Sequence, residues 1–172
     1  MLALAALLLA SASVDASPTL TSVSPWWEKY TFTMTDDGTQ QSCSYRTSLS
    51  ASAKQTCGDD DSPSQMEHKA SAGGSYTKIT VERRFTPASR PDPFAVQTGD
   101  TLLGGQVLAL AIDKAGAVKG CEVVGAQGDL TPPYGCADAK AEKFETSAGQ
   151  SPAAVRHAFM TVLVYGHEEY PV

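Results

Sequence analysis

The chain has 172 residues, of which 42% are hydrophobic and 19% are charged, a balance typical of a globular protein rather than of a disordered one. Its formal net charge of −6 argues against a nucleic-acid partner and against binding to an anionic lipid surface, because both need clustered positive charge. This length allows one ordinary domain or two small ones.

The first ten residues, MLALAALLLA, form an apolar run that is too short to span a bilayer but suits the central region of a signal peptide. Small residues follow, and Val14-Asp15-Ala16 predicts cleavage after Ala16, with Ala10-Ser11-Ala12 as a second candidate. The run lacks the preceding Lys or Arg that signal peptides usually carry, and a buried N-terminal helix is the alternative. We therefore expect residues 1–16 to be removed and the protein to be periplasmic or secreted, with no membrane span after cleavage.

Three strand patterns follow in the first half of the chain. Tyr30, Phe32 and Met34 alternate with threonines, which is typical of a half-buried strand. An Asp-Asp-Gly turn leads to a second strand, and the alternation in TKITVERRF predicts a third. The side chains that share one face of this third strand are Ile79, Val81, Arg83 and Phe85. The polar, glycine-rich stretch 58–74 predicts a loop, so residues 17–86 are expected to form a β-rich unit.

A proline-rich segment, residues 87–100, separates this unit from the rest of the chain. Prolines stand at positions 87, 91 and 93, and proline breaks both strand ladders and helices. The segment is expected to be a linker or a surface crossover between the two halves.

The second half, residues 101–172, repeats the same order of elements with one addition. Leu108, Leu110 and Ile112 alternate, a turn that ends in a glycine follows them, and a second strand comes next. The run FMTVLVY predicts the last strand. Before it, apolar side chains recur at helical spacing after two prolines, which predicts a helix. The residues of this helical face are Tyr134, Ala137, Ala141 and Phe144.

The four cysteines align the two halves. Each half has a cysteine five residues after its turn glycine, and a second cysteine 14 or 15 residues later. Among three possible connectivities we predict the disulfides Cys43–Cys57 and Cys121–Cys136, whereas zinc sites usually have more closely spaced ligand pairs. We interpret the chain as two tandem strand–turn–strand–connection–strand units with an α+β fold, the second with a helix before its last strand. Chance similarity among short β patterns is the alternative.

Residues 105–130, GQVLALAIDKAGAVKGCEVVGAQGDL, contain a Gly-x-Val strand, an Asp-x-x-Gly turn, a Val-rich second strand, and a glycine and a leucine before the predicted helix. In this order they resemble the C-terminal domain of the TonB energy-transducer family, over residues 104–165. Ala126 and Gln127 replace the serines of the family pattern, and Thr146 stands in place of a proline. The resemblance implies a TonB-C-terminal-like fold and docking of an envelope protein by pairing along an edge strand, which would be the last strand here. The partner-binding residues would be Phe159, Thr161, Leu163 and Tyr165; the alternative is that the first unit covers this same edge through a pseudo-twofold contact.

No arrangement of a nucleophile, a base and an oxyanion donor is recognisable in the sequence, so we expect a non-catalytic protein without a metal or cofactor. The three histidines, at 68, 157 and 167, form no metal-binding motif, and the acidic run at 59–61 lacks the glycine and the distant glutamate of a calcium loop. The expected function is contact with another protein. One alternative is a small ligand- or glycan-binding module that uses Trp26 and Trp27, although a tryptophan at the head of a strand is more commonly part of the core. The other is an exported enzyme or inhibitor without a recognisable motif.

Overall fold

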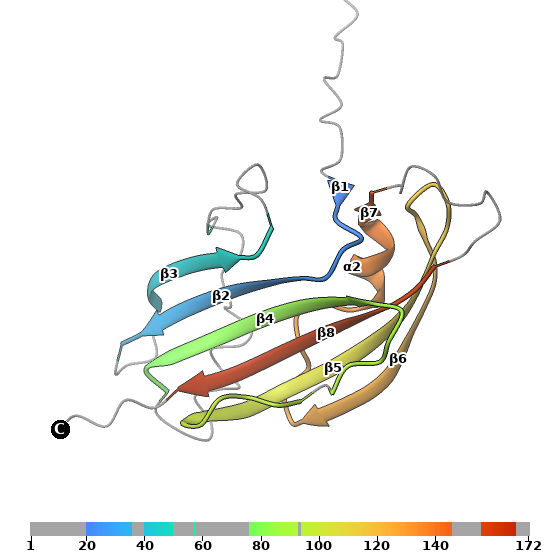
Figure 1. The fold of residues 1–172 in the computed structure, drawn as a ribbon. Coiled ribbons are helices and arrows are strands. Elements are labelled where there is room, and N and C mark those ends of the chain that lie inside the picture. The colour runs from blue at the N-terminus through green and yellow to red at the C-terminus, as the bar shows by residue number, and fades with distance from the viewer. Residues whose placement is uncertain are drawn as a thin grey trace, which may run out of the picture.

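The computed structural model describes residues 20–35, 40–49, 57, 76–92, 94–145 and 156–167. They form a six-stranded antiparallel sheet with the strand order β3-β2-β4-β8-β5-β6 (Figure 1). Its strands are β2 (Trp26–Met34), β3 (Gln40–Thr47), β4 (Lys78–Pro87), β5 (Asp100–Ile112), β6 (Val118–Gly128) and β8 (Arg156–His167). Two short strands, β1 (Leu20–Thr21) and β7 (Lys143–Phe144), pair in parallel, and the helix α2 spans Cys136–Ala141.

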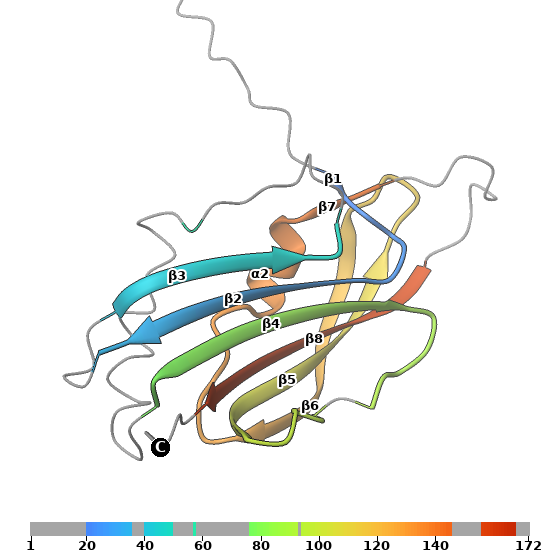
Figure 2. The ribbon, with the colours of Figure 1, turned by 60° about the vertical axis from the view of Figure 1, so that its left-hand side comes forward.

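The sheet has one face that carries the helix and one that does not. We call the side on which α2 lies the helix face; Figure 2 shows the helix behind β2 and β3 and next to β6. The main core cluster is on this face and contains Phe85, Leu110, Met160 and Phe144. Because these side chains come from both halves of the chain, the two predicted units share one core. The predicted alternation on β2, β4 and β5 is confirmed, since its apolar members lie on this face and all but the half-buried Tyr30 are buried.

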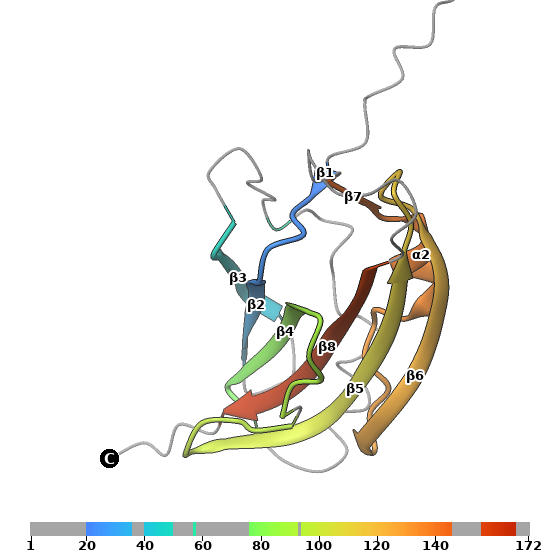
Figure 3. The same ribbon diagram turned by 45° about the vertical axis from the view of Figure 1, so that its right-hand side comes forward.

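The opposite side is named the crossover face, because the segment between β4 and β5 runs over it (Figures 1 and 3). Phe94 of this segment lies against Gly105, and a Cβ atom built on Gly105 would lie 2.8 Å from the Phe94 ring and 3.1 Å from the Leu163 side chain. The proline-rich segment is therefore a packed surface crossover that covers the β8–β5–β6 part of this face. Figure 3 also shows the strong curvature of the sheet between β2 and β6.

The prediction of an α+β fold is wrong. Of the described residues, 62% lie in strands and 6% in the helix, which has six residues. The predicted helical face is also wrong, because Ala139 is buried whereas Ala137 and Ala141 are exposed. The backbone of Glu142 is already extended, and Phe144 lies in β7, where its N–H donates to the carbonyl of Gly116 at 2.8 Å. The residues that the spacing assigns to a second helical turn therefore form a strand instead.

The two halves have the same strand register. In the β2–β3 hairpin Phe32 lies opposite Cys43, and in the β5–β6 hairpin Leu110 lies opposite Cys121, each 78 residues later. The third strand of each half then pairs with the other side of the first strand, and β4 and β8 join the halves. The strand order is therefore the same when it is read from either edge of the sheet, which supports the tandem-repeat interpretation.

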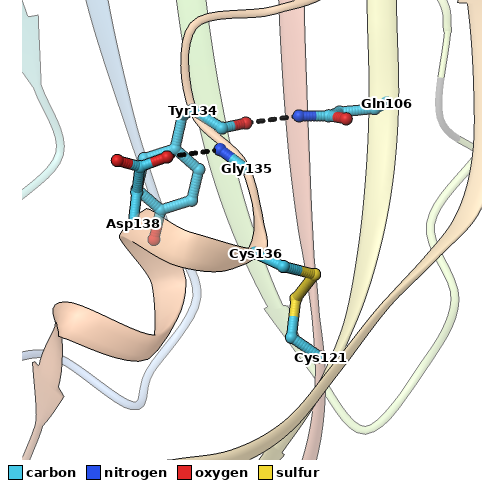
Figure 4. Close-up of a disulfide and its surroundings, with 6 residues drawn as sticks. All are labelled: Gln106, Cys121, Tyr134, Gly135, Cys136 and Asp138. Carbon is cyan, nitrogen blue, oxygen red and sulfur yellow. Dashed lines mark hydrogen bonds between the residues drawn. A yellow bond between two sulfur atoms is a disulfide. The ribbon is translucent and has the colours of Figure 1, made fainter.

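Both disulfides join the cysteines that the spacing predicts. Cys43 is bonded to Cys57 and Cys121 to Cys136, with Cα–Cα distances of 6.1 and 5.6 Å. The second bond ties α2 to β6 (Figure 4). Two disulfides are compatible with a protein exported to an oxidising compartment.

Candidate functional site

The two adjacent tryptophans lie on opposite faces of the sheet. Trp26 is 4% exposed on the helix face, its ring stacks on Phe85 with centroids 5.9 Å apart, and its Nε1–H donates to the carbonyl of Ser22 at 3.0 Å. Trp27 is half-buried on the crossover face. Trp26 is therefore a core residue, and the pair does not form the aromatic ligand platform that was the alternative prediction.

The predicted docking strand is in the middle of the sheet. β8 pairs with β4 along one side and with β5 along the other, so its backbone groups are already used. The prediction that Phe159, Thr161, Leu163 and Tyr165 line an accessible edge is wrong. Thr161 and Leu163 are in addition fully buried. The reason is the pairing of β4 with β8, a contact between the halves that no local sequence pattern specifies.

The edge strands of the sheet are β3 and β6. β6 is the longer of the two, with 11 residues, and within the described part of the chain it pairs only with β5. Its Val123 is the one large apolar side chain among the described residues that is exposed, at 49%. Bulges interrupt the pairing with β5 at two points, and Gly120–Val123 is the regular stretch between them. A regular edge with an exposed valine is the arrangement that pairs most readily with another extended chain.

Neighbouring elements fix β6 in place, and none of those in the described ranges pairs along its outer edge. On the helix face, Cys121 is bonded to Cys136 at the start of α2 (Figure 4). Two hydrogen bonds fix the turn before this helix (Figure 4). The Gln106 amide donates to the carbonyl of Tyr134, and the N–H of Gly135 donates to Asp138 at 2.7 Å. At the bulge, Arg90 donates to the carbonyl of Val124 at 2.9 Å. The edge of β6 is therefore preorganised.

A buried ion cluster lies on the helix face. Arg83 on β4 bonds Glu28 on β2, and its Nη1 lies 2.5 Å from Oε1 of Glu142, just after α2. Tyr45 donates to Glu28 at 3.0 Å, and the Arg83 guanidinium lies 4.3 Å from the Tyr134 ring centroid. Burial acts to lower the pKa of Arg83, but the charges of Glu142 and Glu28 outweigh it and raise that pKa. The cluster joins the two halves, because Arg83 bonds one carboxylate from each.

A second charged cluster lies on the crossover face around Glu82, whose side chain is 4% exposed. Oε1 of Glu82 accepts from Arg84 at 2.6 Å, and Oε2 lies 3.2 Å from Lys29. The Tyr165 hydroxyl donates to Oε2 at 3.1 Å, and burial together with the Glu82 charge raises the pKa of Tyr165. Burial alone would raise the pKa of Glu82, but the hydrogen bond from Arg84 and the charges of Arg84 and Lys29 lower it.

Glu82→Gln should make the protein less stable at neutral pH. It should also remove the part of the pH dependence of the unfolding free energy that comes from protonation of residue 82. Because the pKa of Glu82 is lowered in the folded state, its ionised form stabilises the fold above its ordinary pKa of 4.5, and that contribution is lost as the pH falls below it. We expect the variant to lose about 2 kcal/mol of unfolding free energy at pH 7, and the difference to shrink below pH 4. Urea denaturation at both pH values measures this. A difference that stays constant between pH 7 and pH 3 would contradict the assignment.

The remaining sequence candidates do not gather into a site within the described residues. Nδ1 of His167 lies 2.9 Å from Asp100, and His157 is exposed at the start of β8. His68 and the acidic run at 59–61 lie outside the described residues. Among the residues that are described, no group of three or more His, Cys, Asp or Glu side chains is placed to hold a metal ion. Nor does any described helix have the length and apolar character needed to cross a membrane.

No family model, no curated protein and no solved structure matches the chain. The resemblance to the TonB C-terminal domain therefore stays a prediction, and the site is argued from the geometry. Neither ion cluster was predicted. Arg83 was the sequence feature that pointed to the cluster on the helix face, because the alternation places it on the same face as Ile79 and Val81. A charged residue on an apolar face implies a buried partner of opposite charge. The partners Glu28 and Glu142 are distant in sequence, so the pattern could not name them.

Proposed function

We propose that the protein is an exported, non-catalytic binding protein that docks an extended segment of an envelope protein along β6. The observation that carries the proposal is a long edge strand, regular over Gly120–Val123, with an exposed valine at its centre. An added strand gains main-chain hydrogen bonds, and alternate side chains supply specificity. The signal-peptide pattern of residues 1–16 and the two disulfides support a periplasmic or secreted location.

The side chains of the edge define the segment it would accept. Val123 lies opposite Leu108 and so belongs to the helix face, whereas Glu122 lies opposite Ala109 and belongs to the crossover face. Because neighbouring residues of a strand point to opposite faces, the docked segment would place an apolar side chain beside Val123 and a basic one beside Glu122. The family resemblance implies the same docking mode, with β6 in place of the interior strand β8.

Photo-crosslinking in cells that export the protein tests this proposal. A photoreactive amino acid in place of Glu122 should give a discrete adduct with one envelope protein, and Val123→Lys in the same chain should abolish it, because a charge on an edge strand opposes pairing. Gln127→Lys, an equal change of charge on an exposed residue near the end of β6, should keep the adduct. The proposal is wrong if the folded protein gives no adduct, or if a probe at the exposed turn residue Lys114 gives the same one.

A further inference from the structure

The crossover face is strongly basic over β3, β2 and β4, although the whole chain has a net charge of −6. The strand registers place Arg46, Lys29 and Glu82 side by side in one row across these strands. Arg84 and Lys78 point to the same side of β4 as Glu82, two residues after it and four residues before it. Among the described residues of β3, β2 and β4, four cations on this side thus stand beside one carboxylate, Glu82, and Asp100 of β5 lies on the same side in the row of Lys78. Charge segregated in this way attracts ligands of opposite charge.

The buried carboxylate of Glu82 positions two of these cations. It binds both Lys29 and Arg84, whose side chains are still 27% and 36% exposed. A lysine has three N–H donors and an arginine has five, so both residues have more donors than the bonds to Glu82 use. The Lys29 ammonium is held further by the Trp27 and Tyr165 rings, whose centroids lie 5.7 and 6.0 Å away. Lys29 and Arg84 are therefore held in place before any ligand binds.

Hydroxyl groups and an aromatic ring complete the surface. Thr31 and Thr80 are hydrogen bonded through their Oγ1 atoms at 3.0 Å, and the neighbouring Ser42 and Ser44 on β3 are exposed. Trp27 is half-buried at one end of this array. The contacts of the crossover segment are with Gly105 on β5 and Gly125 on β6.

We infer that this part of the crossover face binds an acidic glycan, a chain of sugar rings that carries carboxylate or sulfate groups. The cations match its anionic groups, the threonines and serines match its hydroxyls, and the Trp27 ring offers an apolar surface to the C–H face of a sugar. The inference is independent of the β6 edge, because the two surfaces lie at opposite ends of the strand order.

Isothermal titration with a tetramer of galacturonic acid tests the inference, with maltotetraose as the neutral comparison. We expect saturable binding of the acidic tetramer that weakens as salt increases, and no binding of maltotetraose. Arg46→Glu should weaken binding about tenfold, since it removes one charge-assisted contact and adds a repulsive charge. Lys114→Glu makes the same change of charge in an exposed turn outside the face, and it should change the affinity less than twofold.

Amide NMR shifts on the titrated protein locate the ligand, and they should be confined to β2, β3 and β4. Absence of saturable binding would overturn the inference, as would equal effects of Arg46→Glu and Lys114→Glu. Two further probes separate other anionic partners. Tighter binding of an oligothymidylate of equal charge would assign the face to nucleic acid, and binding to phosphatidylglycerol vesicles but not to the tetramer would assign it to a lipid surface; either result overturns the glycan.

Discussion

Arg83→Met should lower the free energy of unfolding by about 3–5 kcal/mol, because it leaves the buried carboxylate of Glu28 and the half-buried one of Glu142 without their cation. The side chains of Glu28 and Glu142 are 4% and 19% exposed, so water replaces the lost partner poorly. The methionine still fills the space between the Trp26 and Tyr134 rings, where the guanidinium now lies. Urea denaturation at pH 7 measures the loss.

Two further variants separate charge from packing in this cluster. Arg83→Lys keeps the charge but loses the planar fork that serves two carboxylates at once, and its loss should be smaller than that of Arg83→Met. The triple variant Glu28→Gln/Arg83→Met/Glu142→Gln removes all three charges and should recover much of the stability. If the triple variant is as unstable as Arg83→Met alone, lost packing rather than unpaired charge explains the effect.

The strands could be predicted from the sequence because each carries its own signal. Alternation on a half-buried strand depends on local residues, and it located β2, β4 and β5 together with the face that each buries. The disulfide pairs followed for the same reason, since their spacing is local to each half. Gly116 was also read correctly as a turn residue, and its φ of +79° confirms this.

The order of the strands and the docking edge could not be predicted, because both depend on contacts between the halves. The alternation in β8 is the same whether the strand lies at an edge or in the interior of the sheet. β8 is an interior strand because it pairs with β4, for example Leu163 with Glu82. The prediction of the helical face was wrong for a different reason. Its spacing was helical, but β7 takes Phe144 into the core, where the residue is 0% exposed. The burial of Phe144 in the core outweighs the weak preference of the local sequence for a helix.

Gly116→Ala should cost about 3 kcal/mol of unfolding free energy, for two reasons that act at one atom. An alanine at a φ of +79° is strained, which costs about 1–2 kcal/mol. Its Cβ atom would also lie 1.9 Å from the carbonyl oxygen of Phe144, and relieving that overlap costs a further 1–3 kcal/mol. The turn is poorly able to relax, because Asp113 accepts hydrogen bonds from the N–H groups of Ala115 and Ala117 at 2.8 and 2.9 Å.

Gly120→Ala is the matched control for this prediction. Gly120 lies on β6, and its added Cβ atom would come no closer than 3.3 Å to the Cβ atom of Ala111. We expect this variant to stay within about 1 kcal/mol of the parent protein, since a glycine in a strand is replaced by a residue that restricts the unfolded chain. Thermal or urea denaturation of both variants gives the comparison. Equal stability of the two would mean that β7 moves away from the turn without loss, and that the burial of Phe144 does not depend on the β5–β6 turn.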